Sequence, residues 1–341
     1  MTGWSLWLQF FICMGIIGYG GTQLSRYGDV LAEKIGLGRT WLGLVLLAAV
    51  TSLPESSTGI SAVLWVDAPD ITVGDLLGSC LFNLFILAVV DLLYPPSPVL
   101  TAAERGHLLA ASFAVVMLTV SIMGTLAPLP TAGITLAHIG LSSPILLVCY
   151  LGAMRVIYRY QRRERLAYLQ EQQDEFVYAH IGLGKTVLLF GLAALIVVSA
   201  GIWIPRVAVD LASFMGWHQS LVGTILVAVS TSLPELVVTL GALRLGAVDL
   251  AVGNLLGSNL VNLALLGVMD ILYFKGPLLR AVSLDHAGTG LMAILMTSIV
   301  SAELVYRPPK KALRLVSLGA FLLAFLFAAN VFLQMLTKGR P

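Results

Sequence analysis

The chain alternates long apolar stretches with short polar connections. A stretch of about 20 apolar residues is the length that a helix needs to cross the roughly 30 Å hydrocarbon core of a bilayer. Ten such stretches occur, near residues 4–24, 40–65, 71–94, 107–124, 133–156, 186–205, 219–243, 250–273, 286–304 and 313–336. The pattern therefore predicts ten transmembrane helices.

One long polar segment interrupts this pattern. It covers residues 157–185 and divides the predicted helices five and five. We therefore expect three parts: a first five-helix repeat over 1–156, a cytoplasmic linker loop over 157–185 and a second five-helix repeat over 186–341.

Composition supports a membrane protein. Of 341 residues, 58% are hydrophobic and only 11% are charged, whereas soluble domains carry about 25% charged residues. The N-terminal stretch MTGWSLWLQF lacks the charged start and cleavage site of a signal peptide, so it is expected to be the first span. The net charge of +2 offers no basic surface for nucleic acid. The expected partners are the lipid bilayer and inorganic cations, and the sequence does not predict an oligomeric state.

The distribution of Lys and Arg predicts the orientation. If both termini lie outside, the inner loops and their flanks hold most of the twenty Lys and Arg residues, and only Arg206, Lys275, Arg280, Lys338 and Arg340 remain outside. Positive residues accumulate on the cytoplasmic side, so we expect a multi-pass protein of the plasma (inner) membrane with both termini outside. Five spans per half then make the second half run inverted to the first.

The two halves carry the same pair of motifs. AAVTSLPESS at 48–57 matches AVSTSLPELV at 228–237, and VGDLLGSCLFNL at 73–84 matches VGNLLGSNLVNL at 252–263. The offsets are 180 and 179 residues. Such duplication over five spans per unit is typical of an inverted-topology repeat.

The first motif places a proline and a glutamate inside an apolar stretch, twice. Pro54 and Pro234 remove a backbone hydrogen bond and are expected to break the second and seventh helices. Freed carbonyls at membrane depth persist only where they are buried in protein or line a polar cavity. Glu55 and Glu235 follow the prolines, and a carboxylate at this depth indicates a functional site.

The second motif adds neutral oxygens. Ser79 and Asn83 lie four residues apart on one helix face, as do Ser258 and Asn262. With the hydroxyls of Ser52 and Ser232, the predicted site offers carboxylate, hydroxyl, amide and carbonyl oxygens and no Cys or His. Calcium accepts six to eight such ligands in irregular geometry, and sodium ions of similar radius can replace it at overlapping positions.

Together the motifs resemble the two alpha-repeats of the sodium/calcium exchanger family, within the cation/calcium antiporter superfamily. The resemblance implies an all-α integral membrane fold of ten helices in two inverted five-helix repeats, with helices 2, 3, 7 and 8 broken. It implies that Glu55 and Glu235 are the central Ca²⁺ ligands, assisted by backbone oxygens of Thr51 and Thr231. It places Na⁺ at a larger set of residues, with the two asparagines closing the central position: Ser52, Ser232, Ser79, Ser258, the carbonyls of Ala48 and Ala228, Asn83 and Asn262.

Three departures from the family pattern concern the site. Val50 and Ser230 stand where the family has glycine, and Cys80 replaces the asparagine matched by Asn259. Many prokaryotic relatives carry an aspartate where Asn262 lies. Asp75 stands where the second repeat has Asn254, which makes it an auxiliary carboxylate that could replace the missing one.

The function expected is antiport, in which Ca²⁺ leaves the cytoplasm against an inward flow of Na⁺ by alternating access. An H⁺/Ca²⁺ antiporter on the same scaffold is the alternative, with Glu55 and Glu235 taking protons when Ca²⁺ leaves. An intramembrane enzyme would need a nucleophile or a histidine-bound metal, which the spacing does not offer, and two broken repeats suit occlusion better than a passive channel. No cofactor is expected beyond the transported ions. Asp91, Asp270, His107 and His286 are expected at the membrane boundary and not as ligands.

Overall fold

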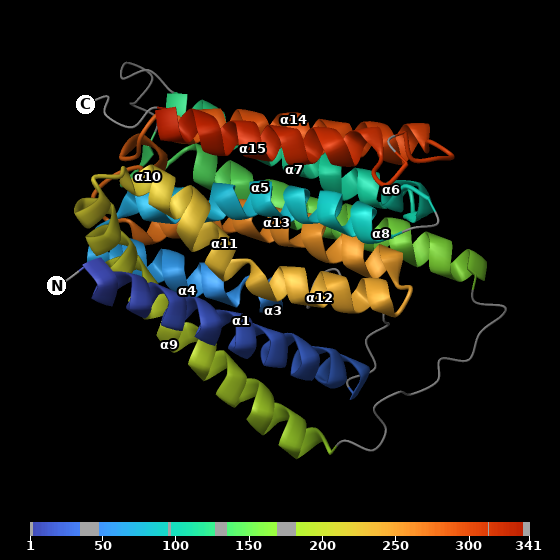
Figure 1. Ribbon diagram of the computed structural model, residues 1–341, viewed down its shortest axis with the longest axis horizontal. Coiled ribbons are helices and arrows are strands. Elements are labelled where there is room, and N and C mark those ends of the chain that lie inside the picture. The colour runs from blue at the N-terminus through green and yellow to red at the C-terminus, as the bar shows by residue number, and fades with distance from the viewer. Residues whose placement is uncertain are drawn as a thin grey trace.

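The computed structural model describes residues 3–34, 48–94, 97–126, 135–168, 182–312 and 314–336. In these residues the chain is helical apart from one short antiparallel hairpin, formed by β1 (Thr135–Leu136) and β2 (Ile139–Gly140). The long helices form an elongated bundle (Figure 1). They are α1 (Gly3–Lys34), α5 (Pro69–Leu93), α7 (His107–Leu126), α8 (Ser142–Tyr168), α9 (Leu183–Met215), α13 (Val248–Leu272), α14 (Asp285–Tyr306) and α15 (Leu318–Leu336).

Seven of the described helices are long and apolar enough to cross a membrane: α1, α5, α7, α9, α13, α14 and α15. An eighth crossing arises if the segments Gln219–Thr231 and Leu233–Arg244, bent by 43° at their junction, form one span. The chain is therefore a multi-pass integral membrane protein. The predicted fifth stretch lies largely in α8, and the predicted second stretch, 40–65, begins within residues 35–47, outside the described part.

The predicted breaks in the second and seventh helices are confirmed. In the first half the chain forms α3 (Ala48–Thr51), α4 (Leu53–Ser61) and η2 (Ala62–Val66), interrupted at Ser52. In the second half it forms α10 (Gln219–Leu221), η4 (Val222–Val227), α11 (Ala228–Thr231) and α12 (Leu233–Arg244), interrupted at Ser232. The interruptions come two residues before each proline.

The predicted breaks in the third and eighth helices are wrong. Both α5 and α13 run without interruption for 25 residues. Their motif glycines serve close packing instead: a Cβ placed on Gly78 would collide with the backbone of Thr224 in η4. Neither helix has a proline beyond its first position, so every interior hydrogen bond can form.

The helices α5 and α13 form the interior of the bundle. In their most apolar windows 78% and 72% of residues are buried, against 28% for α9 and α15. They pack on each other, and each also contacts the broken helix of the opposite half. The helix α5 contacts η4 and α11, and the helix α13 contacts α3 and α4. Figure 1 places them between α14 and α15 on one side and α1 and α9 on the other.

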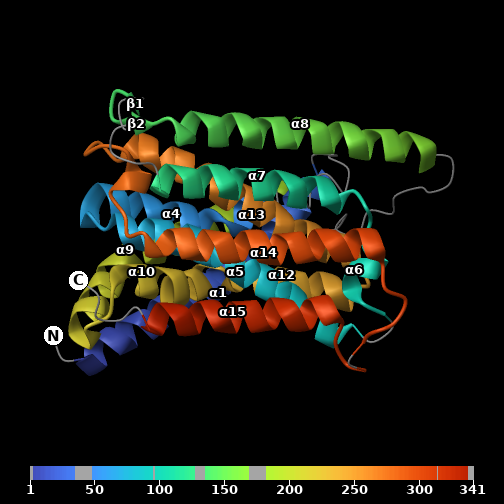
Figure 2. The ribbon, with the colours of Figure 1, turned by 90° about the horizontal axis from the view of Figure 1, so that it is seen from above.

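Two further helices cross between the halves. The helix α8 packs against α13, and α15 packs against α5. Figure 2 shows α8 and α15 along opposite edges of the bundle. The last helix of each half therefore covers the third helix of the other half, so neither half is an independent packing unit.

Aspartates at the ends of α5 and α13 connect the two halves through hydrogen bonds. Asp91, at the end of α5, accepts hydrogen bonds from the backbone N–H of Val99 (2.8 Å) and of Ser317 (2.7 Å). Asp270, at the end of α13, accepts from the N–H of Leu278 (2.5 Å) and of Gly140 (2.8 Å). Both aspartates lie at helix ends but are buried, and each satisfies backbone donors from both halves of the chain.

Histidines join the halves in the same way. His107 Nε2, at the start of α7, lies 3.1 Å from Asp249 of α13. His286 Nε2, at the start of α14, lies 2.9 Å from Asp70 of α5. The two pairs are related by the 179-residue offset.

Candidate cation site

The breaks at Ser52 and Ser232 position the two glutamates. Each serine leaves helical geometry, with φ/ψ of −83°/13° and −87°/10°, and a new helix starts at the next residue. Pro54 and Pro234 then occupy the first turn, where a missing N–H costs no hydrogen bond. Glu55 and Glu235 lie in the same turn, where the positive end of the helix dipole favours a carboxylate.

Glycines bring the outer helices α1 and α9 onto these breaks. A Cβ placed on Gly21 of α1 would collide with the ring of Pro234. A Cβ placed on Gly201 of α9 would collide with Ser57, one turn after Pro54. The two glycines are 180 residues apart, so each outer helix covers the break of the opposite half.

Each glutamate meets a motif serine. The Ser232 hydroxyl donates to Glu55 Oε1 across the halves, at 3.2 Å. The Ser258 hydroxyl donates to Glu235 Oε1 at 3.3 Å and lies 3.3 Å from the Thr51 hydroxyl. Ser79 lies 3.5 Å from the Thr231 hydroxyl. Polar groups of both halves thus converge at the centre of the bundle.

All the residues that the sequence singled out are inaccessible to solvent. The relative exposure is 0% for Ala48, Thr51, Ser52, Glu55, Asp75, Ser79, Asn83, Ala228, Thr231, Ser232, Glu235, Ser258 and Asn262. The predicted ion ligands and Asp75 are therefore all buried in the protein interior.

Several buried polar atoms at this site lack a hydrogen-bond partner among the described residues. They are Oε2 of Glu55 and of Glu235, Oδ2 of Asp75, Oδ1 of Asn83, the Ser52 hydroxyl and both amide atoms of Asn262. Leaving so many buried polar groups unsatisfied is costly. All but one of these atoms are oxygens, the kind of atom that a hard cation binds.

The carbonyls of Ala48 and Ala228 lie at the breaks but already accept hydrogen bonds. Ala48 O accepts from the N–H of Ser52 (3.1 Å) and the hydroxyl of Thr51 (3.2 Å). Ala228 O accepts from the N–H of Ser232 (3.0 Å) and lies 3.2 Å from the hydroxyl oxygen of Thr231. A cation at either carbonyl would compete with the threonine hydroxyl, which can rotate away.

Asn83 has a hydrogen-bond partner, Asn259, that the sequence did not indicate. Asn83 donates its side-chain N–H to Asn259 Oδ1 at 3.0 Å, and Asn259 donates to the carbonyl of Cys80 at 3.3 Å. Cys80 is the equivalent of Asn259 and carries no amide. Asn262, the equivalent of Asn83, consequently lacks the partner that Asn83 has.

Asp75 contacts a residue of the predicted site in the opposite half. The Thr231 hydroxyl donates to Asp75 Oδ1 at 2.8 Å across the halves. Its counterpart Asn254 stays within its own half and donates to Thr239 Oγ1 at 3.2 Å. Thr239 was not singled out by the sequence, because nothing in its spacing sets it apart from other helical threonines.

The donor set limits the kind of cation. Within the described part of the chain, no group of three or more His, Cys, Asp or Glu side chains is placed to hold a metal ion. The groups that do converge are carboxylate, hydroxyl, amide and carbonyl oxygens. Such donors are typical ligands of hard cations such as Ca²⁺ and Na⁺ and not of zinc or copper.

Comparison with known proteins supports the resemblance drawn from the motifs. Residues 5–157 and 185–336 match the family described as sodium/calcium exchanger protein. The inner membrane protein YrbG of Escherichia coli is 27% identical over 301 residues, covering 86% of each chain. A putative antiporter, CaxA of Alkalimonas amylolytica, is 30% identical over 249 residues, covering 71% of this chain and 73% of its own.

The fold also matches solved structures. The sodium-calcium exchanger NCX_Mj, soaked with 2.5 mM Na⁺ and 10 mM Sr²⁺, superimposes with a TM-score of 0.61 at 18% identity, covering 97% of this chain and 99% of that one. The form soaked without Na⁺ and Ca²⁺ gives a TM-score of 0.57. At this level of identity the match concerns the fold alone.

Proposed function

Because the chain belongs to the sodium/calcium exchanger protein family, we propose that it is a secondary antiporter that exports Ca²⁺ from the cytoplasm in exchange for Na⁺. Alternating access of the two repeats around the buried site would carry the ions across the bilayer. In this proposal the transported ions are the substrates, and no covalent bond is made or broken.

One observation carries the proposal. Glu55 and Glu235 are fully buried, each follows a helix break, and each has one carboxylate oxygen without a partner in the described structure. Two ionised carboxylates would supply a charge of about −2, which matches one Ca²⁺. Two buried carboxylates without a counter-ion would be strongly unfavourable.

We assign the remaining ligands by position. The backbone oxygens of Thr51 and Thr231 assist the glutamates at the Ca²⁺ site. The hydroxyls of Ser52, Ser79, Ser232 and Ser258, the carbonyls of Ala48 and Ala228, and the amides of Asn83 and Asn262 form the Na⁺ sites. Calcium is favoured over Mg²⁺, because Mg²⁺ requires a smaller, regular octahedron and retains several waters.

Proton coupling is the second candidate, and one observation favours it. Asp75 is a further buried carboxylate, and it accepts a hydrogen bond from the hydroxyl of Thr231, next to the break at Ser232. A carboxylate that carries a proton in one direction and faces a cation in the other would couple Ca²⁺ to H⁺. The neutral hydroxyls around both glutamates favour Na⁺, because a serine hydroxyl does not titrate near neutral pH.

We propose ten membrane crossings as two inverted five-helix repeats, with 157–185 as a cytoplasmic linker. Supporting this, α1 begins and α15 ends at the same end of the bundle in both views (Figures 1 and 2), as an even number of crossings requires. The distribution of Lys and Arg then places both termini outside. The similarity to the inner membrane protein YrbG of Escherichia coli supports the inner membrane as the location.

The decisive experiment uses purified protein in liposomes. Calcium uptake is measured with a Na⁺ gradient alone, with a pH gradient alone and with neither. We expect uptake driven by Na⁺, and no uptake without a gradient. Uptake driven equally by the pH gradient at zero Na⁺ would replace Na⁺ coupling by H⁺ coupling, and uptake without any gradient would contradict antiport.

A further inference from the structure

Three buried threonines outside the predicted ligand set do not satisfy their hydroxyl groups. The relative exposure is 0% for Thr58 and Thr72 and 3% for Thr224, and none of the three hydroxyls has a hydrogen-bond partner among the described residues. By contrast Thr297, equally buried in α14, donates to the carbonyl of Ala293 at 2.7 Å. A buried hydroxyl without a partner is unfavourable, so these three positions indicate a ligand.

Two of these threonines continue helix faces that carry predicted ion ligands. Thr58 follows Glu55 by three residues in α4, and Thr72 precedes Ser79 by seven residues in α5. Residues at these spacings lie on one face of a helix. The helices α4 and α5 contact each other, so the two hydroxyls extend the polar surface of the predicted site along both helices.

The third threonine extends the site along the second broken helix. Thr224 precedes Ala228 by four residues and lies in η4, a π-helical segment of a kind found frequently at functional sites. Its backbone lies so close to α5 that a Cβ on Gly74 or Gly78 would be 3.0 Å or less from it. Thr224 is therefore beside the turns of α5 that follow Thr72.

All three threonines lie on the same side of the helix breaks. The helix α4 leads from the break at Ser52 to the start of α5, and η4 leads from α10 to the break at Ser232. Figure 1 shows α4 and α10 toward the end of the bundle at which α1 begins and α6 at the opposite end. We call the first of these the N-terminal end, and it faces outside in the proposed topology.

The second half does not repeat these hydroxyls. Leu44, Val238 and Ala251 stand at the equivalent positions. Next to them in the sequence, the side chains of Thr239 and Asn254 hydrogen-bond each other at 3.2 Å. The inverted repeat would make the two approaches to the site alike, but the unpartnered threonine hydroxyls are confined to the one at the N-terminal end.

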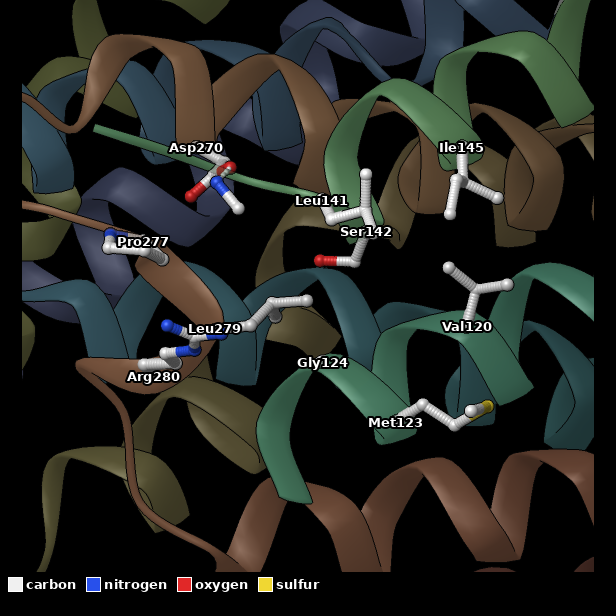
Figure 3. Close-up of a pocket in the computed structure, with 11 residues that line it drawn as sticks. Val120, Met123, Gly124, Leu141, Ser142, Ile145, Asp270, Pro277, Leu279 and Arg280 are labelled. Atoms are coloured by element: carbon white, nitrogen blue, oxygen red, sulfur yellow. Dashed lines mark hydrogen bonds between the residues drawn. The ribbon is translucent and has the colours of Figure 1, made fainter. Parts of the chain in front are cut away.

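A cavity of about 260 Å³ is separate from this row of threonines (Figure 3). It is lined by residues of α7, the start of α8, the end of α13 and the turn that follows, and none of its described lining residues belongs to α4, α5 or η4. Figure 3 shows the Ser142 hydroxyl among them. Ser142 therefore offers a hydroxyl for comparison that lies away from the row.

On the basis of the cation transport proposed above, we propose that Thr58, Thr72 and Thr224 line the route by which cations reach the site from the N-terminal end. Their oxygens replace water around a hard cation before it meets the glutamates. Because the hydroxyls are neutral, they pass a divalent ion on and do not retain it as a carboxylate would. The row serves Ca²⁺ whichever ion is exchanged for it.

The first test is access from the N-terminal face. Thr58→Cys, Thr224→Cys and Val238→Cys are each made in the full-length chain with its three native cysteines replaced by Ala. A membrane-impermeant thiol reagent is added to liposomes at the face that carries the N-terminus, with and without Na⁺ and Ca²⁺. We expect Thr58→Cys and Thr224→Cys to be modified and Val238→Cys to be protected. Protection of both threonine positions under every ionic condition would overturn the proposal.

The second test is the rate of Ca²⁺ exchange. Thr58→Val, Thr72→Val and Thr224→Val keep the side-chain shape and remove only the hydroxyl. Each should slow exchange about fivefold, the effect of one lost oxygen contact, while Ca²⁺ affinity at equilibrium stays within about twofold because both glutamates remain. The melting temperature should not fall, since no hydrogen bond within the protein is lost.

Thr297→Val and Ser142→Ala are the matched controls and should leave exchange unchanged. Unaltered exchange rates in all three threonine variants would contradict a role in the route. The two tests separate this proposal from the proposed function: if wild type does not exchange Ca²⁺ for Na⁺, the labelling still decides whether the threonines line a route.

Discussion

The two predicted halves of the ion site share their glutamates, Ser52 and Ser232, Ser79 and Ser258, and Asn83 and Asn262, but the second motif differs at three positions, two of which change a polar group. Asp75 in the first half corresponds to Asn254 in the second, and Cys80 corresponds to Asn259. Asp75 accepts a hydrogen bond from Thr231 of the opposite half, whereas Asn254 bonds Thr239 of its own half. The side chain of Asn259 accepts a hydrogen bond from the Asn83 amide, whereas the side chain of Cys80 has no amide oxygen to offer Asn262.

This difference separates two requirements of the site. The residues that the halves share are those needed by any cation with oxygen ligands. The residues that differ add a charge on one side of the site and leave the Asn262 amide unpartnered on the other. The choice and ratio of coupling ions should therefore depend on the differing positions, and Ca²⁺ binding on the shared ones.

The largest effect on Ca²⁺ transport is expected at the two glutamates, which both halves share. Glu55→Gln and Glu235→Gln each remove half of the carboxylate charge facing a divalent ion while keeping the side-chain shape. Removing one partner of a buried charge pair costs about 3 kcal/mol, or roughly a hundredfold in affinity. We expect each variant to insert and fold but to lose Ca²⁺ transport in liposomes.

The control for these variants is the polar surface pair Lys275 and Asp67, at 2.6 Å and largely exposed. Lys275→Gln should leave transport unchanged. Near-normal Ca²⁺ flux in either glutamine variant would remove that glutamate from the site and contradict the equal roles of the two halves.

The next effect concerns the neutral oxygens shared by both halves. Replacing Ser79 and Ser258 together by Ala removes two hydroxyls but no charge. Each hydrogen bond contributes about 1 kcal/mol, so the Na⁺ concentration for half-maximal Ca²⁺ efflux should rise about tenfold or more, while Ca²⁺ binding by the glutamates weakens less. A Na⁺ dependence that does not move at fixed pH would contradict Na⁺ coupling.

Sequence reasoning succeeded where the chemistry is local. A proline followed by a glutamate in an apolar stretch predicts both the break and the buried carboxylate, because each effect depends on neighbouring residues. The breaks expected in α5 and α13 came from the resemblance to the family, and they are wrong: no residue in either helix interior removes a backbone hydrogen bond. Which residue packs on Gly78 could not be predicted, because Thr224 belongs to the other half of the chain.

Contacts between distant segments could not be predicted. Asp91 lies near the end of α5, and the sequence did not indicate that it is buried and accepts hydrogen bonds from the backbone N–H groups of Val99 and Ser317. Asn259 was passed over because its role depends on Asn83, which lies 176 residues away. The repeat identified which residues correspond, but not which of them touch.

A smaller effect is expected at the first differing position. Asp75→Asn makes the first half resemble the second and removes one buried carboxylate. A carboxylate at the site can bind a proton in competition with a cation, so the variant should lose part of the inhibition of Ca²⁺ flux at acid pH, and the coupling ratio should change. Ca²⁺ binding should persist, since both glutamates remain.

The matched variant is Asn254→Asp, which makes the second half resemble the first. It should strengthen the inhibition at acid pH. If Asp75→Asn leaves both the pH profile and the ion ratio unaltered, Asp75 only holds Thr231 in place and takes no part in coupling.

The smallest effect is expected at the second differing position. Cys80→Asn supplies the amide that Asn262 lacks, as Asn259 does for Asn83. Satisfying a buried amide contributes about 1 kcal/mol, so the ion-free protein should melt at a higher temperature. The same bond competes with the cation for Asn262, so the further rise in melting temperature on adding Ca²⁺ should be smaller than in wild type. Cys80→Val controls for added volume in this fully buried position, because it supplies no amide. If Cys80→Asn and Cys80→Val shift the melting temperature alike, with and without Ca²⁺, then Asn262 does not gain a partner and its amide does not face the ion.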